Sequence, residues 1–173
     1  MRQLLPEWTA QDAILLAWPH AHSDWLANLD AIEAFYFDLI AVITRFERVL
    51  VICHDEHVRR DLATRLAERA VDLHKVILHT LPCNDTWLRD SGPLGVRQDD
   101  QLVLADFRFN GWGGKFDARL DDAITGTLAA QHAFTAPVQS YALFLEGGSL
   151  DCDGAGSLLT TTCLLYTSDA ADE

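Results

Sequence analysis

The sequence is poor in the features that mark secreted, metal-binding and membrane-spanning proteins. Its four cysteines form no CxxC pair and show no spacing typical of a disulfide framework. No apolar run approaches the ~18 residues that span a bilayer, and residues 1–8 contain neither a charged leader nor an apolar signal core. These absences predict free thiols, no bound metal and a reduced, cytoplasmic setting.

Basic residues are also few, with 13 Lys and Arg against 26 Asp and Glu, so the formal net charge is −13. A surface of this sign repels nucleic acid and anionic lipid and mildly favours small cations. We therefore expect neither nucleic acid nor membrane as a partner. The 173 residues, 49% of them hydrophobic, suit one soluble globular domain or a large piece of one.

The first pattern that is present is helical and starts near Asp24. Apolar residues recur there at steps of three and four, which predicts one buried helical face formed by Trp25, Leu29, Ile32, Tyr36, Leu39, Ile43 and Phe46. Ser23 or Asp24 is a suitable N-cap for the exposed amides of this helix.

Short apolar strands and helices alternate after it. Residues 48–53 are predicted as a buried strand, and a second helix capped by Asp55 follows, with Leu62 and Leu66 on one side. Residues 76–78 form the next predicted strand. This alternation is typical of an α/β fold.

The second half is predicted to contain more strands. Strands are expected at residues 94–96, 102–107, 138–145, 149–152 and 157–161. One helix is expected among them, at residues 120–132. The order of helix, strand, long loop and strand pair recurs twice, which indicates a modular α/β propeller without a plain sequence repeat.

The last residues differ from the rest. Residues 163–173 have no periodicity and resemble the translation of a sequencing adapter. We therefore expect a domain at residues 1–162, followed by a non-native tail at 163–173 that includes Cys163.

A polar loop at residues 84–93 holds the first candidate site. It contains two carboxylates, Asp85 and Asp90, and a carboxylate can hold a planar guanidinium with two parallel hydrogen bonds, while Trp87 offers a flat face for such a cation. The alternative interpretation has Asp85 capping a turn, Trp87 in the core and Arg89 paired with Asp90.

Two glycine-rich loops add further candidates. Trp112 lies among three glycines in residues 109–115, where it can be displayed to a ligand or can plug the edge of the core. Glu146 precedes two glycines at a predicted strand end, a common way to aim a carboxylate into a pocket, although an exposed bulge with a solvated glutamate fits as well.

Metal ligation and a local nucleophile are not expected. His20-Ala-His22 and Cys53-His-Asp-Glu-His57 match no zinc motif. Cys83 lies next to the polar loop but has no histidine or cation near it in the sequence, so we expect an inert thiol.

Together these loops resemble the agmatine deiminase and Porphyromonas-type peptidylarginine deiminase family. The resemblance covers residues 1 to about 162 in the family's order, with its matching stretches at Pro6-Glu-Trp8, Ala17-Trp-Pro-His20, Asn84–Pro93, Phe109–Lys115, Leu145–Ser149 and Leu158–Thr161. It implies the pentein fold, a five-bladed α/β propeller of which this chain would hold only the N-terminal blades.

The resemblance also implies an activity. The family hydrolyses a guanidinium group to a ureido group plus ammonia, and for agmatine the product is N-carbamoylputrescine, a step of putrescine and polyamine metabolism. Asp90 would be the catalytic carboxylate that holds the guanidinium, Glu146 would orient the catalytic histidine, and Trp87 and Trp112 would bind substrate. A cysteine thiolate attacks the guanidinium carbon through a covalent thiouronium. No cofactor is implied, and a homo-oligomer of the full-length protein stays open.

This chain departs from the family in one respect. No cysteine in it matches the motif of the family's nucleophile, so we expect the 173-residue chain to be inactive while its parent protein is a deiminase. Three alternatives remain: a protein-arginine deiminase, a glycosidase that uses Asp90 and Glu146 as its acid pair, and a non-enzymatic domain that binds a cationic ligand.

Overall fold

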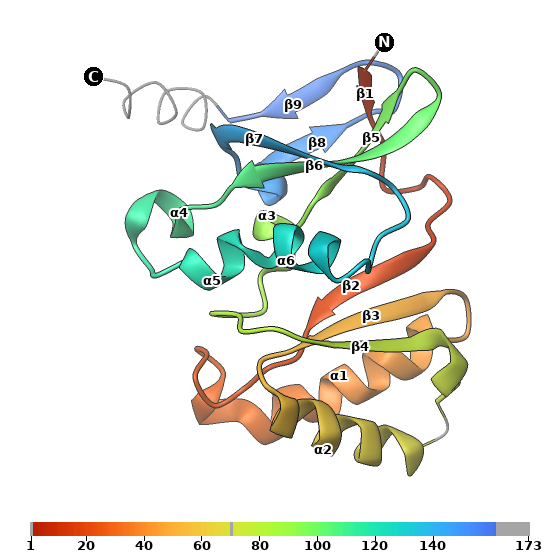
Figure 1. The fold of residues 1–173 in the computed structure, drawn as a ribbon, viewed down its shortest axis with the longest axis vertical. Helices are drawn as coiled ribbons and strands as arrows, with labels where there is room; N and C mark the ends of the chain where they lie inside the picture. Colours follow the sequence, from red (N-terminus) through yellow and green to blue (C-terminus); the bar gives the residue numbers. More distant parts are fainter. Residues whose placement is uncertain (1, 70, 162–173) are drawn as a thin grey trace. The chain divides into compact units, whose positions relative to one another are not determined.

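The computed structural model describes residues 2–69 and 71–161 and divides into two compact units (Figure 1). Residues 10–88 form one, called here the parallel unit, and residues 1–9 with 89–173 form the other, called here the mixed-sheet unit. The tail expected at 163–173, Cys163 included, lies outside the described residues.

The parallel unit is a three-stranded parallel sheet with its helices on one face. The strands lie in the order β2 (Ala13–Ala17), β3 (Arg48–Cys53) and β4 (Val76–Thr80). Its helices are η1 (Leu26–Asn28), α1 (Leu29–Ile43), α2 (Glu56–Ala67) and η2 (Leu73–Lys75). Because parallel strands need crossover connections, α1 and α2 each join one strand to the next.

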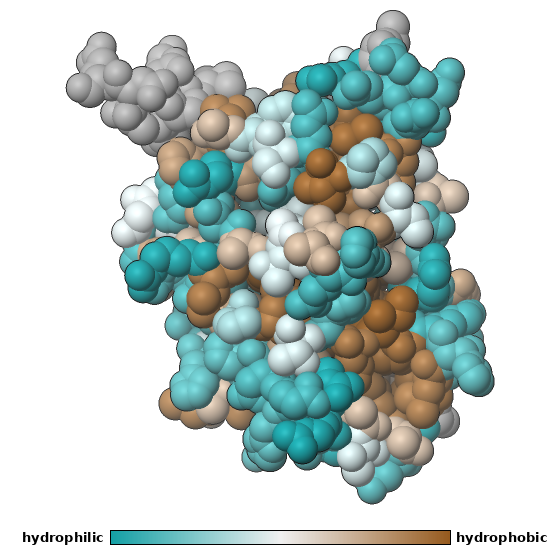
Figure 2. All heavy atoms as spheres, viewed as in Figure 1, coloured by the Kyte–Doolittle hydropathy of each residue, from teal (hydrophilic) through white to brown (hydrophobic). Residues whose placement is uncertain are grey.

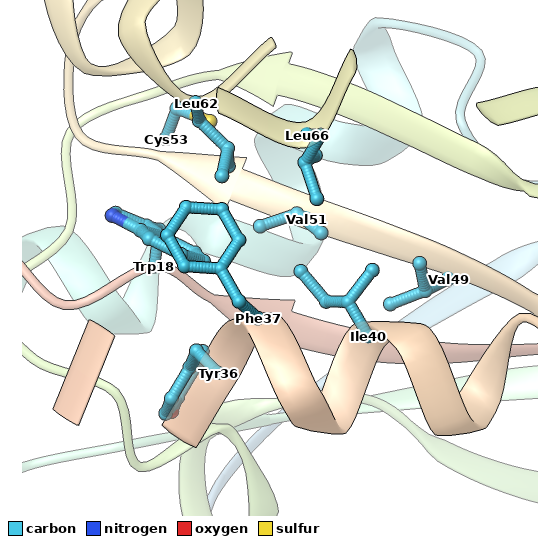
Figure 3. Packing of buried hydrophobic residues seen from close by; sticks show 9 residues of the cluster. All are labelled: Trp18, Tyr36, Phe37, Ile40, Val49, Val51, Cys53, Leu62 and Leu66. Carbon is cyan, nitrogen blue, oxygen red and sulfur yellow. The ribbon is translucent and has the colours of Figure 1, made fainter. Parts of the chain in front are cut away.

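The core of this unit lies between β3 and the two long helices (Figure 3). Val49, Val51 and Cys53 alternate along β3 and are fully buried, and they pack with side chains of α1 and α2. The predicted cap of α2 is confirmed, since the Asp55 side chain accepts a hydrogen bond from the Val58 amide at 2.8 Å.

The prediction for α1 was wrong in its start and is confirmed only in part for its buried face, where Tyr36 is buried and Ile32 and Ile43 pack against the core. The helix begins at Leu29 after Asn28, which makes no side-chain cap, and neither Ser23 nor Asp24 caps it. Its buried residues are Tyr36, Phe37 and Ile40, whereas Phe46 is 75% exposed. The helix is apolar on two sides, so its periodicity alone could not tell which side faces the sheet.

The mixed-sheet unit contains a four-stranded sheet and a separate hairpin. The sheet order is β1 (Arg2–Leu4), β5 (Leu94–Gln98), β6 (Gln101–Arg108) and β7 (Val138–Phe144), and only the β6–β7 pair is parallel. The hairpin is β8 (Leu150–Cys152) with β9 (Leu158–Thr160). Short helices lie between strands: α4 (Gly111–Gly114), α5 (Arg119–Asp122), α6 (Ile124–Ala130) and η3 (Gly147–Ser149).

Most predicted elements are confirmed, including the β5–β6 hairpin, whose turn residues Asp99 and Asp100 have φ of 47° and 67°. The helix expected at 120–132 is instead divided into α5 and α6 at Ala123. Strands β1 and β2 were not predicted from the sequence. No helix among residues 2–69 and 71–161 is long and apolar enough to cross a membrane.

The buried face of α1 can be tested with two matched phenylalanines. Phe37→Ala removes a side chain that is 4% exposed, and we expect it to lower the free energy of unfolding by about 3–5 kcal/mol. Phe35 lies on another face of the same helix and is 57% exposed. Phe35→Ala should therefore change the free energy of unfolding by no more than about 0.5 kcal/mol. Urea unfolding of dilute protein measures both, and equal losses would contradict the assignment.

Candidate functional site

Asp90 lies in α3 (Leu88–Ser91), a single helical turn within the predicted polar loop. Its neighbour Arg89 forms an ion pair with Glu7 at 2.7 Å and donates a longer hydrogen bond to the Leu150 carbonyl at 3.4 Å. The alternative in which Arg89 is paired with Asp90 is therefore replaced by an ion pair with Glu7. The Asp90 carboxylate is half-buried.

Both oxygens of Asp90 accept hydrogen bonds from the two glycine-rich loops. The Gly148 amide donates to Oδ1 at 2.9 Å, and the Trp112 indole Nε1 donates to Oδ2 at 3.1 Å. A carboxylate has about four acceptor positions, so each oxygen keeps capacity for another donor. The three loops singled out in the sequence thus meet at this carboxylate within the mixed-sheet unit.

The conformation of the first glycine loop places the indole. Trp112 has φ of 57° and ψ of 53°, in the left-handed region that a bulky residue seldom adopts. Phe109 and Phe116 hold its ring edge to face, with centroids 5.1 and 5.7 Å away. Gly111 also has positive φ, and a Cβ there would collide with the Phe116 carbonyl, so this tight path requires glycine.

The glycines after Glu146 allow a close backbone approach. A Cβ on Gly147 would collide with the Arg89 carbonyl, and a Cβ on Gly148 would collide with Asp90 Oδ1. Only residues without a side chain let this backbone reach α3 and donate to the carboxylate. This explains the two glycines physically and argues against the exposed-bulge interpretation of residues 145–149.

Glu146 and Asp90 influence each other electrostatically. Burial raises the pKa of Glu146, the negative charge of Asp90 raises it further, and Lys115 opposes the shift. Two carboxylates that repel each other in a partly desolvated site form a site that a cation would stabilise. Asp90, Glu146 and Trp112, three of the four predicted site residues, are therefore brought together.

Trp87, the fourth, belongs to the parallel unit. It is 47% exposed and lies beside Trp25, with ring centroids 6.2 Å apart and planes tilted by 31°. The interpretation of Trp87 as a core residue was therefore wrong. The Asp85 turn is present, since its Oδ1 accepts from the Thr86 amide at 2.7 Å. The substrate-binding role of Trp87 stays a prediction.

A cavity of about 500 Å³ lies next to the Asp90 site in the mixed-sheet unit. Arg89, Gly148, Asp151 and Thr160 are among its lining residues. Neither Asp90 nor Glu146 lines it, so the cavity is a neighbour of the two acids and does not enclose them.

The parallel unit contains a buried cluster that the sequence analysis missed. His20 Nε2 lies 3.6 Å from Cys83 Sγ, and His54 Nδ1 lies 3.0 Å from the Cys83 carbonyl oxygen. The expectation that Cys83 has no histidine near it was therefore wrong, because these residues are far apart in the sequence. In the sequence, the His20-Ala-His22 motif was the signal that could have pointed to this cluster.

Donor atoms of His20, His54 and Cys83 lie within 4.8 Å of one another, a set that could hold a metal ion. Two observations favour a hydrogen-bonded cluster instead. The His22 amide donates to His20 Nδ1 at 3.2 Å, which leaves the proton of the neutral ring on Nε2, facing the sulfur. The His20 and His54 rings are also stacked at 4.1 Å and 27°, so their lone pairs do not converge.

The cluster predicts a pH dependence of stability. The pKa of His20 is lowered from 6.5 to about 4, first by burial and then by His54 and His22. Between these values the unfolded chain binds the proton more readily than the folded one, so stability falls as pH drops from about 6.5 to about 4, by up to about 3 kcal/mol.

Unfolding measured from pH 7 to 4 in wild type and His20→Gln checks this expectation. The variant should lose most of the slope in this window, whereas His57→Gln, at an exposed histidine, should keep it. Parallel pH profiles of wild type and His20→Gln would contradict it.

The Asp90 hydrogen bonds can be tested at Gly148. A Cβ at Gly148→Ala forces the Asp90 carboxylate away from its present position. We expect the free energy of unfolding to fall by about 1.5–3 kcal/mol, which is typical of the loss of a hydrogen bond to a charged group. Hydrogen exchange of the Trp112 indole N–H should accelerate. Gly126→Ala is the matched control, since a Cβ there meets nothing within 4 Å. An unchanged indole exchange rate in Gly148→Ala would refute the arrangement.

Comparison with known proteins shows the family of the chain. The sequence profile of the Porphyromonas-type peptidyl-arginine deiminase family matches residues 3–170. A Legionella pneumophila protein provisionally named an agmatine deiminase is 35% identical in a 172-residue alignment that covers 94% of this chain and 46% of that protein. The agmatine deiminase of Stutzerimonas stutzeri is 31% identical, over 92% of this chain and 43% of its own.

Solved structures give the same result. A variant of C. jejuni agmatine deiminase with substrate bound is 32% identical, with a TM-score of 0.83 over 99% of this chain and 49% of that one. The chain spans about half the length of the relatives it matches. Its α/β fold is that of these deiminase structures. The chain belongs to the Porphyromonas-type peptidyl-arginine deiminase family.

Proposed function

We propose that the whole protein is an agmatine deiminase, which hydrolyses the guanidinium of agmatine to a ureido group and releases ammonia. The observation that carries this proposal is the Asp90 carboxylate, held by two donors beside Glu146. A carboxylate fixed in this way offers two parallel acceptors to a planar guanidinium. Preorganised acceptors hold the cation without reorganising, which favours the positioning of its central carbon.

Glu146 and the two tryptophans complete the proposed roles. Burial and the charge of Asp90 raise the pKa of Glu146. A cation between the two acids would oppose this shift and favour the charged form of Glu146, because it attracts the negative charge. A charged Glu146 can then orient and charge a catalytic histidine. Trp112 holds Asp90 and shapes the pocket, and Trp87 offers a half-exposed face for the substrate.

In the proposed reaction, a cysteine thiolate of the whole protein attacks the guanidinium carbon. The C–N bond to the leaving nitrogen breaks, and the histidine gives that nitrogen a proton, so that ammonia departs. Water then replaces the sulfur and yields the ureido product. Cys53 does not suit the role of nucleophile, because burial raises its pKa to about 12.

Agmatine is preferred over peptidyl-arginine on one ground. The named relatives from Stutzerimonas stutzeri and C. jejuni are agmatine deiminases, and the C. jejuni structure has its substrate bound. We further propose that the parallel unit and the mixed-sheet unit supply blades of a five-bladed propeller. The two substrates are distinguished by measuring how fast the whole protein releases ammonia from agmatine and from a peptide with a C-terminal arginine.

The described site itself should bind agmatine weakly without turning it over. In the 173-residue chain, we expect agmatine to shift the NMR signal of the Trp112 indole N–H, because that group donates to Asp90. Asp90→Asn should weaken binding by at least about tenfold, since a charge-assisted contact of roughly 1.5–3 kcal/mol is lost. Asp100→Asn, in the exposed β5–β6 turn, makes the same charge change and should leave binding intact.

Two results would count against the proposal. Agmatine binding that is indifferent to Asp90→Asn would remove the assigned role of this carboxylate. Ammonia release from agmatine by the 173-residue chain would show that the proposed division of catalytic groups within the whole protein is wrong.

A further inference from the structure

The parallel unit exposes nonpolar side chains of two kinds. Hydrophobic residues gather at the lower right of the view in Figure 2, where Figure 1 draws part of α1 and the strand ends of this unit. Trp25 and Trp87 form the second kind, a pair of indole rings of which Trp25 is partly exposed and Trp87 is 47% exposed. An aliphatic surface does not select a charge, whereas the face of an indole attracts cations. The tryptophan pair therefore has the chemistry that suits a cationic ligand.

Trp87 lies at the centre of a tight turn. The Leu88 amide donates to the Thr86 carbonyl at 2.9 Å, and this contact closes a turn of three residues. The side chain at the centre of the turn remains accessible, in agreement with the exposure of Trp87. The position of its ring therefore depends on how Thr86 is held and on what the ring contacts.

Thr86 is held by three side chains. Its Oγ1 accepts a hydrogen bond from the Trp25 indole Nε1 at 2.9 Å and donates to Asp85 Oδ1 at 3.3 Å. Tyr36 of α1 is also hydrogen-bonded to the Thr86 side chain, and burial raises the pKa of Tyr36, so that it stays a neutral phenol. Trp25 is thus one of the groups that fix the turn from which Trp87 is displayed.

Trp25 is itself fixed by the backbone around it. Its carbonyl accepts from the Asn28 amide at 2.8 Å, and its amide donates to Ser23 Oγ at 3.4 Å. From this position its ring lies beside that of Trp87, with centroids 6.2 Å apart and planes tilted by 31°. Aromatic pairs attract each other at centroid distances of about 4.5–7 Å. Trp25 therefore contacts both the turn that carries Trp87 and the Trp87 ring.

We propose that Trp25 is a positioning residue of the substrate site, which holds the Trp87 ring in the orientation that receives a flat guanidinium. The inference rests on the proposed function, from which it takes the substrate role of Trp87. A ring that Trp25 holds on one side loses little conformational freedom when a cation stacks on its exposed part. Trp25 acts through Trp87 and does not touch the reacting atoms, so its loss weakens substrate binding and spares the chemical step.

Steady-state kinetics of the whole protein with agmatine test this pair. Trp25→Leu should raise KM by about three- to tenfold and change kcat by less than about twofold, because a contact of an aromatic pair is lost. Trp87→Leu should raise KM by at least as much. In the Trp87→Leu background, Trp25→Leu should have no further effect on KM, because its contribution passes through the Trp87 ring. Circular dichroism verifies that each variant is folded.

Variants of Thr86 test the hydrogen bond separately from the ring contact. Thr86→Val keeps nearly the same shape but removes the acceptor of the Trp25 indole N–H, so KM should rise by about threefold. Thr86→Ser keeps the hydroxyl and should have the KM of the wild type. Thr64→Val, at an exposed threonine of α2, makes the same change away from the pair and should leave KM unaltered.

The outcomes separate this inference from the function on which it rests. If Trp25→Leu leaves KM unchanged, or raises it equally with and without Trp87, the positioning role is overturned while the substrate role of Trp87 stands. A wild-type KM in Thr86→Val also overturns it. If Trp87→Leu itself leaves KM unchanged, the substrate role of Trp87 in the proposed function is wrong, and the role of Trp25 falls with it.

Discussion

The site depends on one hydrogen-bonded carboxylate. Asp90 receives the Gly148 amide on one oxygen and the Trp112 indole on the other, so a single side chain ties three separate loops together. Each loop has a conformation that serves this contact: the one-turn α3, the left-handed Trp112, and the glycine pair whose backbone would otherwise collide with α3. Because both donors belong to the folded chain itself, they hold the carboxylate in one orientation.

This arrangement explains why glycine is frequent around the site. Gly111 lies where a side chain would collide with the Phe116 carbonyl, and Gly147 and Gly148 lie where it would collide with Arg89 or Asp90. Glycine costs conformational entropy on folding, so such positions are stable only where the close approach is compensated. Here the compensation is a charge-assisted hydrogen bond to Asp90 and the aromatic contacts of Trp112.

The parallel unit has two further groups of residues outside that site, one polar and one apolar. His20, His54 and Cys83 form a buried hydrogen-bonded group, in which burial keeps His20 neutral at physiological pH. Helix α1 contributes Phe37 to the core and Phe35 to the surface, so neighbouring residues in the sequence serve opposite faces. In both groups the tertiary surroundings of a residue, and not its side-chain type, determine its protonation or its burial.

The sequence by itself determined the α/β class, the strand at residues 48–53, the Asp55-capped helix, the β5–β6 hairpin and the candidates Asp90, Trp112 and Glu146. These follow from local rules: apolar periodicity, capping and turn chemistry, and the loop motifs. Tertiary structure alone decided which face of α1 is buried, that Arg89 pairs with Glu7, and that Cys83 has a histidine beside it. The physical reason is that burial and contact depend on residues distant in sequence, and a helix with two apolar faces carries no local signal to choose between them.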